Sequence, residues 1–186
     1  MANAEFLHFR PARLADAAAV AALHADSWRR HYRDAYSDAF LDGDVSADRV
    51  AVWKDRLSVA TGRDHTLLAE QRGVVVGFVH TILGEDPIWG ALLDNLHVTY
   101  SHKRRGIGAR LLKLSAEIVI NQAPGSGLHL WVLEQNRPAQ AFYQALGGAC
   151  VERGVVPAPG GVPGRLNGSP ACLRYAWPEP RNLLRT

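Results

Sequence analysis

A basic, glycine-containing turn between a strand-like and a helix-like segment is the strongest constraint on the fold. Residues 91–98 are rich in β-forming side chains, whereas residues 108–121 repeat leucine and isoleucine at helical spacing. Between them lies the run Lys103-Arg104-Arg105-Gly106-Ile107-Gly108-Ala109. Glycines let the backbone approach a ligand closely, and free N–H groups at a helix start attract phosphate oxygens. The turn therefore predicts an anion site built mainly from backbone.

The remainder of the chain alternates strand and helix patterns around this turn. Residues 128–133 are apolar at nearly every position, as expected for a strand that is covered on both faces and paired in parallel. The whole order predicts a mixed α/β sheet flanked by helices. Strands are predicted at 6–10, 65–70, 74–83, 91–98, 128–133, 149–155 and 171–177, and helices at 17–30, 47–59, 108–121 and from Pro138 to the stop at Gly147.

Composition favours one ordinary globular domain. The chain has 186 residues, of which 47% are hydrophobic and 21% charged, so the disordered class is excluded. Its apolar stretches end well short of the roughly 20 residues that span a bilayer. Residues 1–10 lack the pattern of a secretion signal, and Cys150 and Cys172 lack metal-ligand spacing. We expect a single cytoplasmic domain over 1–186 without a metal, in which residues 178–186 are a candidate for a flexible tail.

Two nucleotide-binding alternatives for the turn fail on particular residues. A dinucleotide-binding loop needs a third glycine where Leu111 stands, and a Walker loop needs Gly-Lys-Ser/Thr, which is absent. A Gly-x-Gly turn alone is equally compatible with a tight connection whose cations are simply solvated. A second block of sequence is therefore needed to decide.

That second block lies on the next strand and helix. The strand 128–133 is followed by Asn136, Pro138 and then Phe142-Tyr143 on a helix. Together the two blocks resemble the GNAT superfamily of N-acetyltransferases, whose hallmark is Gln/Arg-x-x-Gly-x-Gly/Ala between the fourth strand and the third helix. The match has one departure, because Lys103 stands where the family usually has Gln or Arg and Arg104 stands where a glycine is common.

The resemblance implies both a fold and a coenzyme. The fold is a mostly antiparallel sheet splayed between its fourth and fifth strands, and acetyl-coenzyme A (acetyl-CoA) is the co-substrate. Backbone groups of Leu96 and Val98 would pair with the pantetheine arm, Asn136 would bind the arm, and Tyr143 would lie beside the sulfur. The pyrophosphate would lie against Lys103, Arg104, Arg105, Gly106, Ile107, Gly108 and Ala109. Apart from the resemblance, Asn136 is compatible with a helix cap and Tyr143 with a core aromatic.

Direct acetyl transfer needs a proton donor and a base but no protein nucleophile. A tyrosine stays protonated at neutral pH, so Tyr143 is the candidate general acid. Asp94 is the candidate base, because period-2 alternation would place it on one strand face with Leu96 and Val98. Glu134 and His97 are alternatives to it. Asp94 is equally compatible with a strand-end carboxylate that only makes a hydrogen bond.

The acceptor is expected to be a primary amine of a small molecule or a peptide. Trp28, His31 and Tyr32 fall where the family builds its acceptor pocket, although Trp28 is also a good candidate for core packing. The alternative function is a non-catalytic acyl-CoA-binding sensor with the same fold. We expect no nucleic-acid partner, since no aromatic residues are interleaved with the cations, and no membrane partner. The oligomeric state is open, with a homodimer among the alternatives.

Overall fold

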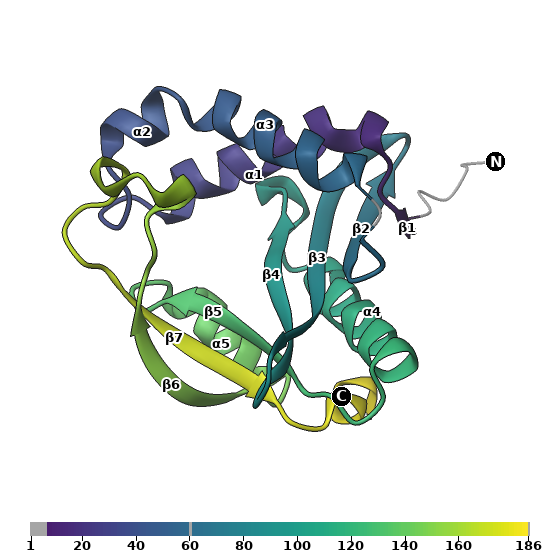
Figure 1. The fold of residues 1–186 in the computed structure, drawn as a ribbon. Coiled ribbons are helices and arrows are strands. Elements are labelled where there is room, and N and C mark those ends of the chain that lie inside the picture. The colour runs from purple at the N-terminus through teal and green to yellow at the C-terminus, as the bar shows by residue number, and fades with distance from the viewer. Residues whose placement is uncertain (1–6, 60, 186) are drawn as a thin grey trace.

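A computed structural model describes residues 7–59 and 61–185, so Phe6 of the first predicted strand and Thr186 of the predicted tail lie outside the described residues. The strands form one mixed sheet of seven in the order β1-β2-β3-β4-β5-β7-β6. Only β4 and β5 run parallel, and all other pairs are antiparallel (Figure 1). The strands are β1 Leu7–Pro11, β2 Asp64–Gln71, β3 Val74–Asp86, β4 Gly90–Val98, β5 Leu128–Leu133, β6 Ala149–Val155 and β7 Ala171–Trp177.

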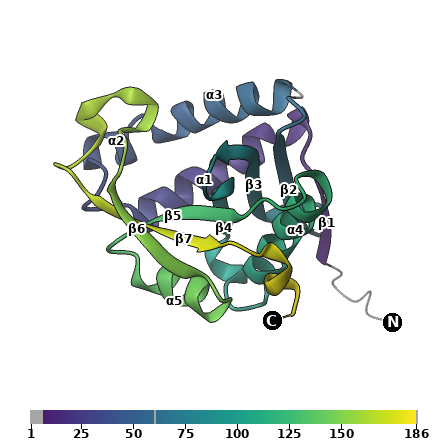
Figure 2. The ribbon, with the colours of Figure 1, turned by 60° about the horizontal axis from the view of Figure 1, so that its bottom comes forward.

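Helices cover both faces of the sheet. Helices α1 to α3 lie on one side of the sheet, and α4 and α5 lie on the other (Figure 2). The five-residue α2 was not predicted, because aspartates at both ends mask its short apolar pair Phe40 and Leu41. No helix in the described ranges is both long and apolar enough to cross a membrane. The helices are α1 Ala17–His31, α2 Asp38–Asp42, α3 Val45–Ser58, α4 Ile107–Gln122 and α5 Arg137–Ala145.

A β-bulge in β4 changes which side chains share a face. Thr81 of β3 pairs with Leu93 and His80 pairs with Asn95, so Asp94 is the extra residue between them. The carboxylate of Asp94 meets Arg56 of α3, where Arg56 Nη1 donates to Asp94 Oδ2 at 2.7 Å. The prediction that Asp94 shares a face with Leu96 and Val98 is therefore wrong, because the bulge interrupts the alternation on which it depended.

The opposite face of β3 and β4 packs on α4. Val79 pairs with Leu96 and Gly77 with Val98, and Gly77 lies so close to α4 that an added Cβ would come within 3.2 Å of the Ile107 side chain. On the same face, Thr81 Oγ1 donates to Ser115 Oγ at 2.9 Å. This packing holds the beginning of α4 directly behind the end of β4.

Two segments without predicted regular structure are anchored to the rest of the protein. The loop 156–170 contains two 3₁₀ turns and is tied to the α1–α2 junction, since Ser37 N donates to Arg165 O and Asn167 N to Ala35 O, each at 2.9 Å. Near the C-terminus, Pro180–Arg185 forms a 3₁₀ helix that contacts α4 and buries Leu183 completely. The described part of the tail candidate 178–186 therefore includes a packed segment.

Candidate active site

Strands β4 and β5 pair only at the beginning of their common length. Two residue pairs, Ala91 with Leu128 and Leu92 with His129, join them. Beyond Leu92 the two strands separate (Figure 1), so the described residues provide no sheet neighbour on this side for the end of β4. Unpaired backbone N–H and C=O groups inside a sheet need another partner. An extended ligand with amide groups can supply it by adding a strand-like edge.

The turn at the end of β4 carries a second set of free backbone donors. The amide of Lys103 donates to Tyr100 O at 3.3 Å, and α4 begins with Arg110 N donating to Gly106 O at 3.0 Å. Within the described ranges, the six amides of residues 104–109 have no hydrogen-bond acceptor. Free amides at a helix N-terminus bind anions, so the turn retains the donors that a diphosphate requires.

Two residues of the turn adopt left-handed backbone conformations. Gly106 has φ +78° and Arg104 has φ +61°, so both lie in the left-handed region that glycine adopts without strain. Arg104 thus adopts a conformation that explains why a glycine is common at this position. Left-handed residues placed in this way turn successive amides toward one concave anion site. The side chain of Ile107 is buried in the core, so only its backbone faces the turn.

A cavity of about 340 Å³ lies between the end of α1 and the beginning of α5. The cavity links the second sequence block to the basic turn. Asn136 lines it, and so does His31, whose Nε2 lies 2.7 Å from Lys103 Nζ. Burial, followed by the charge of Lys103, lowers the pKa of His31, so its neutral imidazole accepts a hydrogen bond from Lys103. The cavity is lined by Arg30, His31, Arg33, Asp34, Gln135, Asn136 and Pro138.

Asn136 and Tyr143 lie on the helix that follows β5. Asn136 caps α5, since its Oδ1 accepts from Ala139 N at 3.3 Å, while its Nδ2 has no partner among the described residues. Tyr143 is 9% exposed and packs between Phe142 and Trp177. Its hydroxyl has no hydrogen-bond partner in the described ranges, and burial raises its pKa above the usual value of tyrosine. Both side chains therefore keep a donor without a protein partner among the described residues.

Residues 25–148 match the acetyltransferase (GNAT) family, a range that includes the turn, Asn136 and Tyr143. The chain belongs to the GNAT acetyltransferase family. It is 30% identical over 138 residues to the uncharacterized N-acetyltransferase YuaI of Bacillus subtilis, covering 73% of this chain and 76% of that protein. A probable N-acetyltransferase of Mycobacterium tuberculosis is 28% identical over 140 residues, covering 74% of this chain and 77% of that protein. The chain is therefore an acyltransferase.

Solved structures agree with the GNAT fold. The PaiA N-acetyltransferase of Thermoplasma acidophilum, solved in complex with coenzyme A, superposes with a TM-score of 0.70 at 18% identity, covering 92% of this chain and 99% of that chain. YncA of Salmonella typhimurium, solved with acetyl-CoA, gives a TM-score of 0.63 at 18% identity and covers 92% and 93% of the two chains. The predicted α/β fold with strands splayed between β4 and β5 is confirmed.

This acetyltransferase also has a cluster of aromatic residues from α1 and the connection between α1 and α2. Trp28 packs against Tyr36 with ring centroids 4.9 Å apart and carries the guanidinium of Arg49 4.2 Å above its ring. Tyr32 lies 5.6 Å from Trp28, and burial together with the charge of Asp94 raises its pKa to about 12. Trp28 is thus largely a packing residue, and Tyr32 is close enough to Asp94 to sense its charge.

The three candidate bases have different environments. Asp94 is ion-paired with Arg56, and its side chain is 29% exposed. Glu134 lies just after β5 and is held by Arg153, which lowers its pKa. His97 bonds through Nδ1 to Ser27 Oγ at 2.8 Å, and burial lowers its pKa to about 3. Asp94 is close enough to Tyr32 for its charge to act on the phenol, and both Asp94 and His97 lie on the part of β4 beyond its pairing with β5, whereas Glu134 is paired with Arg153.

Arg56 and Arg49 are site residues that the sequence analysis did not single out. Both lie on α3, and their charges act on the buried His24 of α1. Arg49 is 7% exposed, an unusual state for an arginine, and it is paired with Asp48. In the sequence, an arginine on a helix stripe is typical of a solvated face, so no local signal marks these two.

Proposed function

We propose that this enzyme transfers the acetyl group of acetyl-CoA directly to a primary amine of a small molecule or a peptide. The observation that carries the proposal is the meeting of two sets of unpaired backbone groups, the end of β4 and the amides of residues 104–109. One set fits an amide-containing arm and the other fits a diphosphate. A coenzyme with both parts, in that order, satisfies both sets.

The residues present fit this coenzyme. Leu96 and Val98 lie on the unpaired length of β4, and Asn136 Nδ2 is free at the cavity beside it. The cations Lys103, Arg104 and Arg105 add positive charge around the free amides of the turn. In this proposal, Ile107, Gly108 and Ala109 act through their backbone. His31 belongs to the coenzyme side rather than to the acceptor pocket, because it bonds Lys103.

Bound acetyl-CoA supplies an acetyl group already activated as a thioester. The leaving sulfur must gain a proton, and Tyr143 holds one at Oη because its raised pKa keeps the phenol neutral. The burial that raises this pKa also raises the pKa of a thiol in the same place, which offsets the weaker acidity of the buried phenol. Tyr143 is thus the proposed general acid.

The acceptor amine must lose a proton on the α1–α3 side of the splay. Asp94 remains the proposed base, acting directly or through water, because it lies near Tyr32 on this side and has a carboxylate oxygen beyond the one that bonds Arg56. His97, with a pKa of about 3, is a weak base and is better suited to orienting the site through Ser27. Tyr32 is proposed to line the acceptor pocket, with Trp28 packed behind it.

The test is release of free thiol from acetyl-CoA by the purified enzyme, measured over a panel of amines and peptide N-termini. The proposal expects thiol release that depends on a particular amine and a product heavier by one acetyl group. Coenzyme A should also raise the melting temperature of the protein. If the coenzyme stabilises the protein but no amine promotes thiol release, the protein acts as an acyl-CoA sensor and the proposal is wrong.

A further inference from the structure

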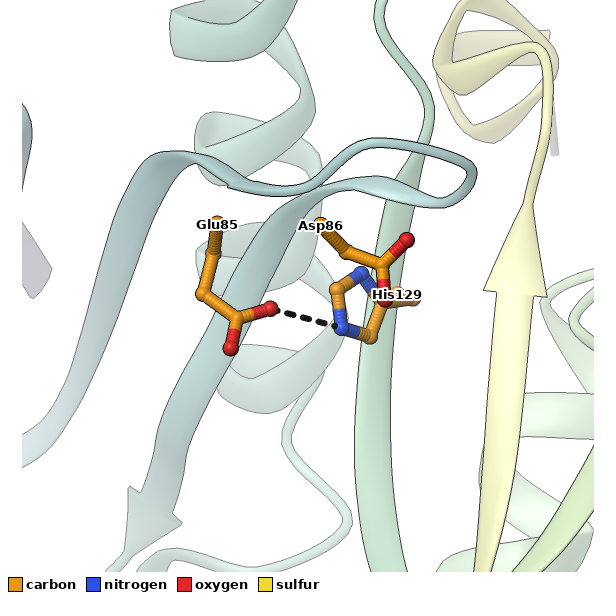
Figure 3. Close-up of side chains that lie close together, drawn as sticks. All are labelled: Glu85, Asp86 and His129. Carbon is orange, nitrogen blue, oxygen red and sulfur yellow. Dashed lines mark ion pairs between the residues drawn. The ribbon is translucent and has the colours of Figure 1, made fainter.

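Three potential metal ligands meet at the base of the splay, away from the turn and Tyr143. Glu85 and Asp86 end β3, and His129 lies on β5 beside its pairing with Leu92 (Figure 3). One donor atom from each of the three lies within 4.8 Å of the others. The sequence predicts no metal, since its two cysteines lack metal-ligand spacing, and His129 lies far along the chain from Glu85 and Asp86.

His129 is the independent sign that this cluster binds a ligand. Its side chain is fully buried, and neither ring nitrogen makes a hydrogen bond of good geometry in the part of the chain that the structure describes, although the ring lies near the backbone of Trp89 and the carboxylate of Glu85. A buried polar group left without a partner costs about 1–3 kcal/mol. Nε2 faces the carboxylate of Glu85, with 3.4 Å between Nε2 and Oε2 (Figure 3). Nε2 is therefore aimed at the carboxylate of Glu85, with Asp86 close by.

The separation of His129 and Glu85 suits a tetrahedral cation. Two ligands bound to Zn²⁺ at about 2.0–2.1 Å in tetrahedral geometry lie about 3.4 Å from each other. This equals the 3.4 Å between His129 Nε2 and Glu85 Oε2. An imidazole combined with carboxylates also favours Zn²⁺ over the purely oxygen-bound Mg²⁺ and Ca²⁺.

Asp86 is held in place by groups that would support a bound metal. Its Oδ1 accepts from the amides of Ile88 and Trp89, each at 2.8 Å, and its Oδ2 accepts from Arg174 Nη1 at 2.8 Å. A carboxylate oxygen has two lone-pair sites, so Oδ2 keeps one for a cation. The charge of Arg174 is shared with Glu152, whose Oε2 lies 3.1 Å from Arg174 Nε. The carboxylates of Glu85, Asp86 and Glu152 outnumber the single guanidinium of Arg174, so this group of side chains carries a net negative charge.

We propose that Glu85, Asp86 and His129 bind one Zn²⁺ ion, with water as the fourth ligand. The ion would join the β3–β4 hairpin to β5 at the point where β4 and β5 stop pairing. It would thereby fix the angle at which the two strands separate, independently of which amine the enzyme acetylates.

The site can be tested by titrating Zn²⁺ into tag-free protein that has been treated with a chelator, with heat measured by calorimetry. The wild type should bind one ion per chain, and Glu85→Gln should weaken binding at least about tenfold. Glu85 is partly exposed, so this variant should fold normally. Glu117→Gln, an exposed glutamate on α4, is the matched control and should bind as the wild type does. Co²⁺ should give a visible absorption band that the Glu85 variant lacks.

Hydrogen exchange gives a second readout that does not depend on activity. Zn²⁺ should slow exchange of the amides in residues 84–90 of the wild type, and less so in His129→Gln. The proposal is overturned if the wild type binds no Zn²⁺, if Glu85→Gln binds it equally well, or if bound Zn²⁺ leaves exchange in the hairpin unchanged. Tighter binding of another divalent ion at the same residues would overturn the assignment to zinc.

Discussion

At the scale of single residues, the hydroxyl of Tyr143 is the group whose removal isolates one chemical role. Tyr143→Phe keeps the ring between Phe142 and Trp177, and the lost hydroxyl has no partner among the described residues. We therefore expect stability and coenzyme affinity to change little. Loss of a positioned proton donor should lower kcat roughly 10²-fold or more. Steady-state kinetics and calorimetry with coenzyme A measure the two effects separately.

Tyr175→Phe is the matched control for this change. Tyr175 is also buried and lies 6.1 Å from Tyr143, but its hydroxyl accepts a hydrogen bond from Gln144 Nε2 at 2.9 Å. Its removal should lower stability by about 1 kcal/mol and leave kcat unchanged. An unaltered kcat in Tyr143→Phe would show instead that water protonates the leaving sulfur.

At the scale of elements, the sequence predicted the strands because their patterns are local. Leu128–Leu133 matches its predicted bounds, since a continuous apolar run of this length is typical of a strand buried on both faces. The bulge at Asp94 was not predictable, because nothing in residues 91–98 marks an extra residue. The same limit applies to Arg56, which reaches Asp94 only once α3 has packed against α1. Motif residues were thus predictable, and the partners that orient them were not.

The turn before α4 offers a test of an element through its backbone. Gly106 is left-handed at φ +78°, and no atom lies within 4 Å of the place where a Cβ would stand. Gly106→Ala therefore adds about 1 kcal/mol of backbone strain without a steric clash. The turn can relieve this strain by rotating its backbone, which moves the amides that would face the diphosphate. We expect the Kd for coenzyme A, measured by calorimetry, to rise about fivefold.

Gly62→Ala separates this effect from general strain. Gly62 also has positive φ and open space around it, but it lies in the connection between α3 and β2. Gly62→Ala should lower the free energy of unfolding about as much as Gly106→Ala does and leave the affinity for coenzyme A unchanged. Equal affinity in Gly106→Ala and the wild type would mean that the turn does not hold the diphosphate.

At the scale of the whole molecule, the two faces of the sheet differ in polarity. The face toward α4 is packed mainly with aliphatic side chains, whereas the face toward α1 and α3 buries imidazoles. There Trp53 Nε1 donates to His24 Nδ1 at 3.0 Å, and Thr66 Oγ1 lies 2.8 Å from His80 Nδ1. His24 and His80 are each 1% exposed, so both are neutral in the folded protein and must take up protons to become charged on unfolding.

This burial predicts that the protein loses stability in mild acid. Burial, followed by the charge of Arg56, lowers the pKa of His80 from 6.5 to about 4, and burial likewise lowers that of His24. Between pH 4 and 6.5 the unfolded chain binds more protons than the folded one. The contribution of the buried histidines to the free energy of unfolding is therefore fully present above pH 6.5 and is lost as the pH falls toward 4. Asp16 and Asp48, whose pKa values lie below 3.8, lose their contributions only at lower pH. Between pH 6.5 and pH 5, the protonation linked to His80 alone should lower the free energy of unfolding, measured with urea, by about 2 kcal/mol. In His80→Gln the free energy of unfolding should depend less steeply on pH. Equal stability of the wild type at these two pH values would contradict the neutral, buried state of His80.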